Sequence, residues 1–233
     1  MKTAVLISGQ IRNAKECYQS LFEHIINPYK ADVFIDTWLP HNYTLDHRNQ
    51  FIPNNMMVDE VLREYRPKLS TFEDFDSSPL MNAIGKVNIQ NREAYDGSWA
   101  HETIAPNIFY MHYKSWRCYE LMRNYESIND VRYNRIIRMR FDLAFDGFPI
   151  IEPESNTIYI PEGGDHRGGL NDLMALGDAD SMKRYFEVFN NLFSYANAQM
   201  GFHPESIMRK HLEFSNLKVK RFSINYKLRG EYL

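Results

Sequence analysis

Short apolar runs alternate with amphipathic stretches in the first part of the chain. Residues 3–9 (TAVLISG) and residues 31–38 (ADVFIDTW) are mainly apolar and read as buried strands. Between them, residues 14–26 place apolar side chains at helical spacing, and Asn27-Pro28 is expected to end that helix. The opening therefore predicts a β-α-β unit, which favours a parallel sheet with a right-handed crossover.

The same alternation continues towards the carboxyl end. Helices are expected at 58–65, at 108–125, from 178 or 180 to about 195, and from 203 onward. Strands are expected within 67–75, 133–145, 156–161 and 218–222, and long irregular segments at 40–54 and 76–106. These elements predict a single α/β domain over residues 1–233, with a mostly parallel central sheet flanked by helices.

Composition narrows the functional classes. Hydrophobic residues make up 44% of the chain and charged residues 24%, with a formal net charge of −3. This balance does not predict a nucleic-acid partner. Cys17 and Cys118 make no disulfide framework, and no apolar run reaches membrane-spanning length, so we expect a cytoplasmic protein without a membrane span.

The stretch RMRFD at residues 138–142 carries the strongest chemical signal. Alternation along a strand would place Arg138, Arg140 and Asp142 on one face. Two guanidiniums and a carboxylate at a strand end suit a phosphate-bearing ligand and a divalent cation. The alternative is an edge strand with a solvated face and an internal Arg–Asp pair.

A second signal lies where the first two strands end, because ligands of open α/β sheets bind at the carboxyl ends of strands. In the second strand, Asp36 is a candidate hydrogen-bond partner for a ribose or base, and Trp38 is a candidate stacking platform. The alternative is a capping aspartate and a core tryptophan. The candidate binding residues at these two ends are Ser8, Gly9, Gln10, Arg12, Asp36, Thr37 and Trp38.

The third group surrounds a segment with four glycines, residues 162–169. Asp165 lies within this segment and Asp172 follows it. A carboxylate that removes a proton from a sugar hydroxyl must lie within hydrogen-bond reach of that hydroxyl. Asp172 is the first candidate for this base, although Asp and Gly are also common in turns for conformational reasons. At the next helix start, His203 is a candidate metal ligand, and Glu205 is also explained by the helix dipole.

These segments together resemble the GT-A-type, nucleotide-sugar-dependent glycosyltransferases, of the small kind found in polysaccharide loci and in large DNA viruses such as chloroviruses. The resemblance covers nearly the whole chain and depends on the order of its pieces. The matching pieces are VLISGQIR at 5–12, ADVFIDTW at 31–38, RMRFD at 138–142, NDLMALG at 171–177 and the Pro204-Glu205 helix start.

The resemblance implies a GT-A-like fold that moves a sugar from a nucleoside-diphosphate sugar to a glycan or glycoprotein acceptor. Asp172 would act as the base of an inverting displacement. Such enzymes hold Mn²⁺ or Mg²⁺ with an Asp-x-Asp pair, but here Arg140 occupies the first Asp position. Asp142 and His203 are then the candidate metal ligands. The expected nucleotide-sugar-binding residues are Ser8, Gly9, Gln10, Arg12, Asp36, Thr37, Trp38, Arg138, Arg140 and Asp165.

Two other readings stay open at this point. One is a non-catalytic nucleotide-sugar or glycan-binding module on the same fold. The other is a nucleotidyltransferase, which the first loop disfavours because it contains Arg12 and no lysine.

Overall fold

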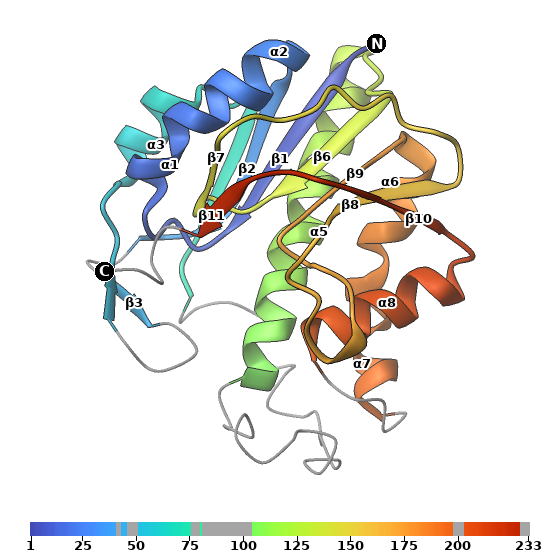
Figure 1. The fold of residues 1–233 in the computed structure, drawn as a ribbon. Helices are drawn as coiled ribbons and strands as arrows, with labels where there is room; N and C mark the ends of the chain where they lie inside the picture. Colours follow the sequence, from blue (N-terminus) through green and yellow to red (C-terminus); the bar gives the residue numbers. More distant parts are fainter. Residues whose placement is uncertain (41–42, 46–50, 76–79, 81–103, 198–202, 229–233) are drawn as a thin grey trace.

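A computed structural model describes residues 1–40, 43–45, 51–75, 80, 104–197 and 203–228. They form a seven-stranded mixed sheet with helices on both faces, which confirms the predicted α/β class (Figure 1). The strands of this sheet are β1 (Thr3–Gly9), β2 (Asp32–Trp38), β5 (Leu69–Glu73), β6 (Arg135–Met139), β8 (Thr157–Pro161), β9 (Met174–Gly177) and β10 (Lys218–Phe222). Two small antiparallel pairs join β3 (Tyr43–Leu45) to β4 (Phe51–Pro53) and β7 (Leu143–Phe145) to β11 (Tyr226–Leu228).

The helices connect these strands and cover the sheet. They are α1 (Ala14–Leu21), a π-helical turn (Phe22–Ile26), α2 (Asn27–Tyr29), α3 (Val58–Tyr65), α5 (Ile104–Asn129), a 3₁₀ turn (His166–Gly168), α6 (Ala179–Phe186), α7 (Val188–Asn197) and α8 (Pro204–Phe214). Among the described helices, none combines the length and the apolar character that a membrane span needs.

The strand order is β10-β8-β9-β6-β1-β2-β5. Only β9 runs against its neighbours, pairing antiparallel with both β6 and β8, while the other pairs are parallel. Six strands therefore end at one edge of the sheet, and β9 begins at that same edge. The segments that leave β1, β2, β6 and β8 and the segment that enters β9 all gather there.

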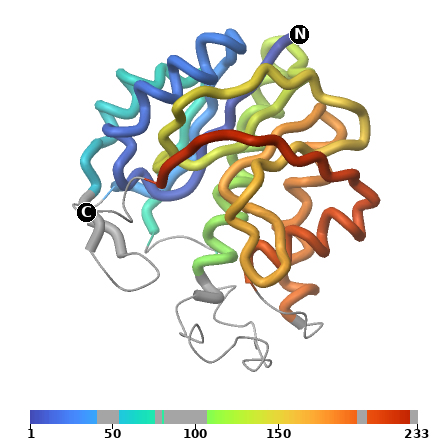
Figure 2. Tube along the Cα trace, in the orientation of Figure 1, coloured from blue at the N-terminus to red at the C-terminus, as the bar shows by residue number. Residues whose placement is uncertain are grey.

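Alternating side chains divide the core between the two faces of the sheet. Leu6 and Phe34 pack with the group of α5 to α8, whereas Ile7 and Ile35 pack with α1, α3 and the β7–β11 pair. All four side chains are fully buried, which explains why β1 and β2 read as unbroken apolar runs. Figure 2 shows the carboxyl-terminal segment crossing the sheet to reach β7, where β11 pairs with it.

Several expected boundaries were wrong. The first helix does not end at Asn27-Pro28 but stays helical to Tyr29. It ends because Lys30 takes a left-handed conformation with φ 49°, and the amides of Lys30 and Ala31 bond to carbonyls of the last turn. The expected helix at 178–195 is divided into α6 and α7, and the helix expected at 108–125 extends over Ile104–Asn129.

The expected strand at 133–145 is two strands, because the chain leaves the sheet after Met139 and β7 pairs with β11 instead. Residues 40–54, expected to be irregular, include β3 and β4. Most of the expected loop at 76–106 lies outside the described residues. Strand β9 was not predicted, since a four-residue apolar run does not by its periodicity distinguish strand from turn.

Candidate functional site

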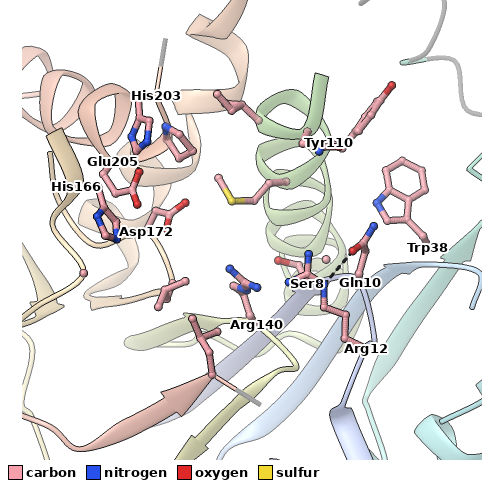
Figure 3. Close-up of a pocket in the computed structure, with 18 of the residues that line it drawn as sticks. Ser8, Gln10, Arg12, Trp38, Tyr110, Arg140, His166, Asp172, His203 and Glu205 are labelled. Atoms are coloured by element: carbon pink, nitrogen blue, oxygen red, sulfur yellow. Dashed lines mark hydrogen bonds and ion pairs between the residues drawn. The ribbon is translucent and has the colours of Figure 1, made fainter. Parts of the chain in front are cut away.

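A cavity of about 550 Å³ opens at the edge of the sheet where the parallel strands end. That volume lies within the range typical of small-molecule sites. Figure 3 shows its two sides: Ser8, Gln10, Arg12 and Trp38 lie on one, and Asp172, Glu205, His203 and His166 on the other. Arg140 lies between the two groups.

The turn after β1 forms one wall and is held by hydrogen bonds. Gly9 has a φ of +106°, a conformation that suits glycine, and Thr37 Oγ1 donates to its carbonyl at 2.5 Å. The Arg12 amide donates to Asn54 Oδ1 at 2.9 Å. Ser8 Oγ is buried without a hydrogen-bond partner among the described residues, although Ser8 lines the cavity. Such an atom needs an explanation, and a ligand in the cavity provides one.

Asp142 joins two arginines that line the cavity. Arg140 contacts both carboxylate oxygens, with Nε 2.8 Å from Oδ1 and Nη2 2.6 Å from Oδ2. Arg12 Nη1 lies 3.0 Å from Oδ2. Burial raises the pKa of Asp142, but the Arg140 and Arg12 guanidiniums outweigh it and hold the pKa at about 2. The turn after β1 and the segment after β6 are therefore joined by one ionised carboxylate.

These contacts do not fit the expected metal site. A hard divalent cation needs carboxylate oxygens that face it, and both oxygens of Asp142 face guanidinium groups. His203, the other expected ligand, lies beside Glu205, with Nδ1 and Oε2 2.7 Å apart. Within the part of the chain that is described, no three His, Cys, Asp or Glu side chains form a group suited to a metal ion.

Asp172 lies two residues before β9, and the antiparallel course of β9 is what brings it to this edge. Asp172 is only 7% exposed, yet it lines the cavity. Arg138 donates to its backbone carbonyl, and Asn171 fixes the turn by bonding to the Gly163 carbonyl and the Leu173 amide. Burial raises the pKa of Asp172 and nearby Glu205 raises it further, against the opposing effect of Arg138 and Arg140. A raised pKa improves a carboxylate as a proton acceptor near neutral pH.

The start of α8 supplies Glu205 to the same side of the cavity. Glu205 is 8% exposed, and its backbone carbonyl accepts from the Leu170 amide at 2.9 Å. Gly169 lies so close that a Cβ there would be 2.2 Å from the Glu205 carbonyl carbon. The glycine-rich segment and α8 are thus packed directly against each other, and this contact places Glu205 near Asp172.

Four residues expected to bind the nucleotide sugar lie outside the cavity lining: Asp36, Thr37, Arg138 and Asp165. Thr37 is fully buried and holds the β1 turn, and Arg138 is bound to Ser115 Oγ and the Asp172 carbonyl. Asp165 pairs with Arg221 and accepts from the Asn171 amide. Each of them positions a neighbouring segment, and strand periodicity alone did not distinguish that role from contact with a ligand.

Asp36 belongs to a buried ion network behind the cavity wall. The fully buried Lys114 lies 2.9 Å from Asp36 Oδ1 and 2.7 Å from Glu73 Oε2, and Arg117 contacts both acids. Burial raises the pKa of Asp36, and Lys114 opposes that shift. Lys114 Nζ also lies 4.0 Å from the centroid of the Trp38 ring. The network therefore holds Trp38 in place. Trp38 is only 7% exposed, so the alternative of a core tryptophan describes this residue well.

Aromatic residues beside Trp38 line the cavity and were missed from the sequence. Phe75 lies 5.1 Å from Trp38 and 4.8 Å from Tyr110 between ring centroids. Tyr110 comes from α5 together with Asn107 and Met111. The spacing of these three residues places them on one face of a helix, which was the available signal.

Comparison with known proteins gives no match for this chain, either among protein-family models or among curated proteins.

Proposed function

We propose that this protein transfers a sugar from a nucleoside-diphosphate sugar to a hydroxyl group of a glycan or glycoprotein acceptor. The fold would then be GT-A-like and the reaction an inverting one. The observation that carries the proposal is one cavity that is lined both by hydroxyl and cationic groups and by a buried carboxylate. These are the two kinds of group that this displacement requires.

The donor's diphosphate would lie against the β1 turn and Arg140. Breaking the bond between the sugar and the phosphate leaves a nucleoside diphosphate whose negative charge grows in the transition state. Arg12 and Arg140 are already fixed by Asp142, so their charge stabilises the leaving group without reorganising first. Ser8 Oγ, which lacks a partner among the described residues, would bond to a donor oxygen.

Asp172 would receive the acceptor's proton from the other side of the cavity. The acceptor hydroxyl oxygen forms a bond with the anomeric carbon while the carbon–oxygen bond to the diphosphate breaks, and the hydroxyl proton passes to the Asp172 carboxylate. Asp172 lies across the cavity from Arg12, with Arg140 between them (Figure 3), and inversion needs such a carboxylate opposite the leaving group. The exposed glycine-rich segment beside it would admit the acceptor.

The test is release of nucleoside diphosphate from a panel of nucleotide sugars, with and without glycan acceptors. Asp172→Asn keeps the size of the side chain and removes the base, so we expect turnover to fall by roughly 10²- to 10⁴-fold with donor binding retained. Asp180→Asn, an exposed acid at the start of α6, is the control and should keep full activity. Analysis of the product by NMR should show an inverted anomeric centre.

Nucleotide binding without turnover on any donor and acceptor would contradict the proposal and indicate a binding module instead. Full activity in Asp172→Asn would contradict the role of that residue alone.

A further inference from the structure

The contacts of Asp142 define how the cavity would hold a diphosphate. Three nitrogen atoms from two arginines lie within 3.0 Å of its two oxygens. The side chain of Asp142 is 5% exposed, whereas those of Arg12 and Arg140 are 24% and 22% exposed. The carboxylate is therefore the inner partner, and the two cations are the groups that reach the cavity.

The charge of this unit favours an anion. Within this group of three side chains, Arg12 and Arg140 carry two positive charges and Asp142 carries one negative charge. Arginine stays protonated at all relevant pH values and presents several donors in a fixed plane, which suits phosphate oxygens. A divalent cation placed among these three side chains would face two guanidiniums, and both oxygens of Asp142 already contact guanidinium nitrogens.

The backbone places both arginines at one edge of the sheet. Arg12 has a left-handed φ of 44° in the turn after β1, and Arg140 follows β6, the direct neighbour of β1. Gln10 Oε1 accepts from Arg12 Nε at 3.0 Å, as the dashed line in Figure 3 shows. Gln10 and Asp142 thus fix the direction of the Arg12 guanidinium before any ligand arrives.

We propose that Arg12 and Arg140, fixed by Asp142, bind the diphosphate of the nucleotide directly, so that nucleotide binding needs no divalent cation. This inference rests on the proposed function, because it assumes that the ligand is a nucleoside diphosphate. It differs from the metal-assisted reaction that the resemblance implies, and it assigns Asp142 to the arginines as their counter-ion.

The first experiment measures binding of UDP, GDP, ADP and CDP by titration calorimetry, in EDTA and in Mn²⁺ or Mg²⁺. We expect one of these nucleotides to bind in EDTA with a Kd within about threefold of its value with metal. Binding that appears only with metal would overturn this inference and leave the proposed function standing. No binding under any condition would contradict both.

The second experiment separates phosphate binding from a structural effect. Arg140→Gln alone leaves the buried Asp142 with Arg12 as its one arginine partner among the described residues, so the double variant Arg140→Gln/Asp142→Asn is tested beside it. In both variants, the Kd of the bound diphosphate in EDTA should rise roughly 10- to 100-fold, the range expected for losing charge-assisted hydrogen bonds. Binding of the matching nucleoside, which has no phosphate, should stay unchanged.

Arg123 and Glu126 provide a matched control. Arg123 pairs with Glu126, whose side chain is 1% exposed, three residues further along α5. Arg123 lies 12 residues beyond Met111, about 18 Å along the helix from the cavity. Arg123→Gln/Glu126→Gln should bind the diphosphate like the unchanged protein. An unchanged Kd in the Arg140 variants, or an equal loss of nucleoside binding, would overturn the inference.

Discussion

Asp142 and Asp172 are both buried beside one cavity, yet their surroundings move their pKa values in opposite directions. For Asp142, the Arg140 and Arg12 guanidiniums outweigh burial and hold the pKa at about 2. For Asp172, burial and Glu205 outweigh the opposing effect of Arg138 and Arg140 and raise the pKa. Two acids with diverging pKa values suit two different tasks. Asp142 organises two guanidiniums, and the raised pKa of Asp172 suits the proposed role of proton acceptor.

Asp172→Asn should stabilise the fold at pH 7. A raised pKa means that the ionised carboxylate is disfavoured in the folded protein. The stability that the protonated Asp172 contributes is therefore complete below the unfolded-state pKa of about 4. This stability is lost as the pH rises through the folded-state pKa. We expect Asp172→Asn to raise the thermal midpoint at pH 7, with a gain that shrinks towards pH 4.

Thermal melts of Asp172→Asn across that pH range, with Asp180→Asn as an exposed control, measure the effect. A lower midpoint for Asp172→Asn at pH 7 would show that the carboxylate stabilises the site rather than straining it.

The glycine-rich segment and α8 act as one unit at the scale of elements. Beyond the contact of Gly169 with Glu205, Arg209 Nη2 donates to the Gly169 carbonyl at 3.2 Å, and Ser206 Oγ lies 3.3 Å from the Arg167 carbonyl. These three contacts come from about one turn of α8 and hold the glycine-rich segment against the helix. The segment can lie this close because position 169 has no side chain. This side of the cavity therefore depends on backbone packing as much as on its charged groups.

Gly169→Ala should separate this segment from α8. A Cβ 2.2 Å from backbone atoms forces a shift, and overpacking of this kind typically costs about 1–3 kcal/mol in the free energy of unfolding. Gly177→Ala in β9 is the control, because its nearest contacts are 3.1–3.2 Å away and two of the three are side-chain atoms. Urea unfolding should show the larger loss for Gly169→Ala. Equal losses would contradict the role assigned to this contact.

At the scale of the whole molecule, one sheet separates two apolar cores and connects them. The side chains of β1 and β2 alternate between the α5–α8 core and the α1–α3 core, so neither core is complete without the same two strands. The ion network of Asp36, Glu73, Lys114 and Arg117 adds a contact from β2 and β5 to α5. Loss of either core would expose the other.

The described part of the chain should therefore unfold in one transition. Trp38 and Trp116 belong to the core packed on α5. In a Trp99→Phe variant the tryptophan fluorescence therefore reports that face, while far-UV circular dichroism reports all elements. We expect the two signals to change together in urea, with the same midpoint. Separate midpoints would show that the two faces of the sheet unfold independently.

Much of the first half of the sheet was predictable because β1 and β2 are buried on both faces and read as apolar runs. Helix α3 was also predicted at its observed bounds. Ser8, Arg12 and Arg140 were predicted as candidate groups because they lie at or just beyond the ends of apolar runs, and Asp172 because it follows the glycine-rich segment. The role of Arg138 was not, since alternation gives the face of a strand but not the depth of a side chain.

The sequence by itself determined the alternation of strands and helices, and with it the edge of the sheet where polar groups gather. Only the tertiary structure decided that β9 runs antiparallel between β6 and β8, because a four-residue strand has no direction until it pairs. That pairing brings Asp172 to the cavity. The structure likewise decided that Asp142 faces two guanidiniums, since one of them comes from a turn 130 positions earlier in the chain. Contacts between residues so far apart along the chain produce no periodic pattern in the sequence.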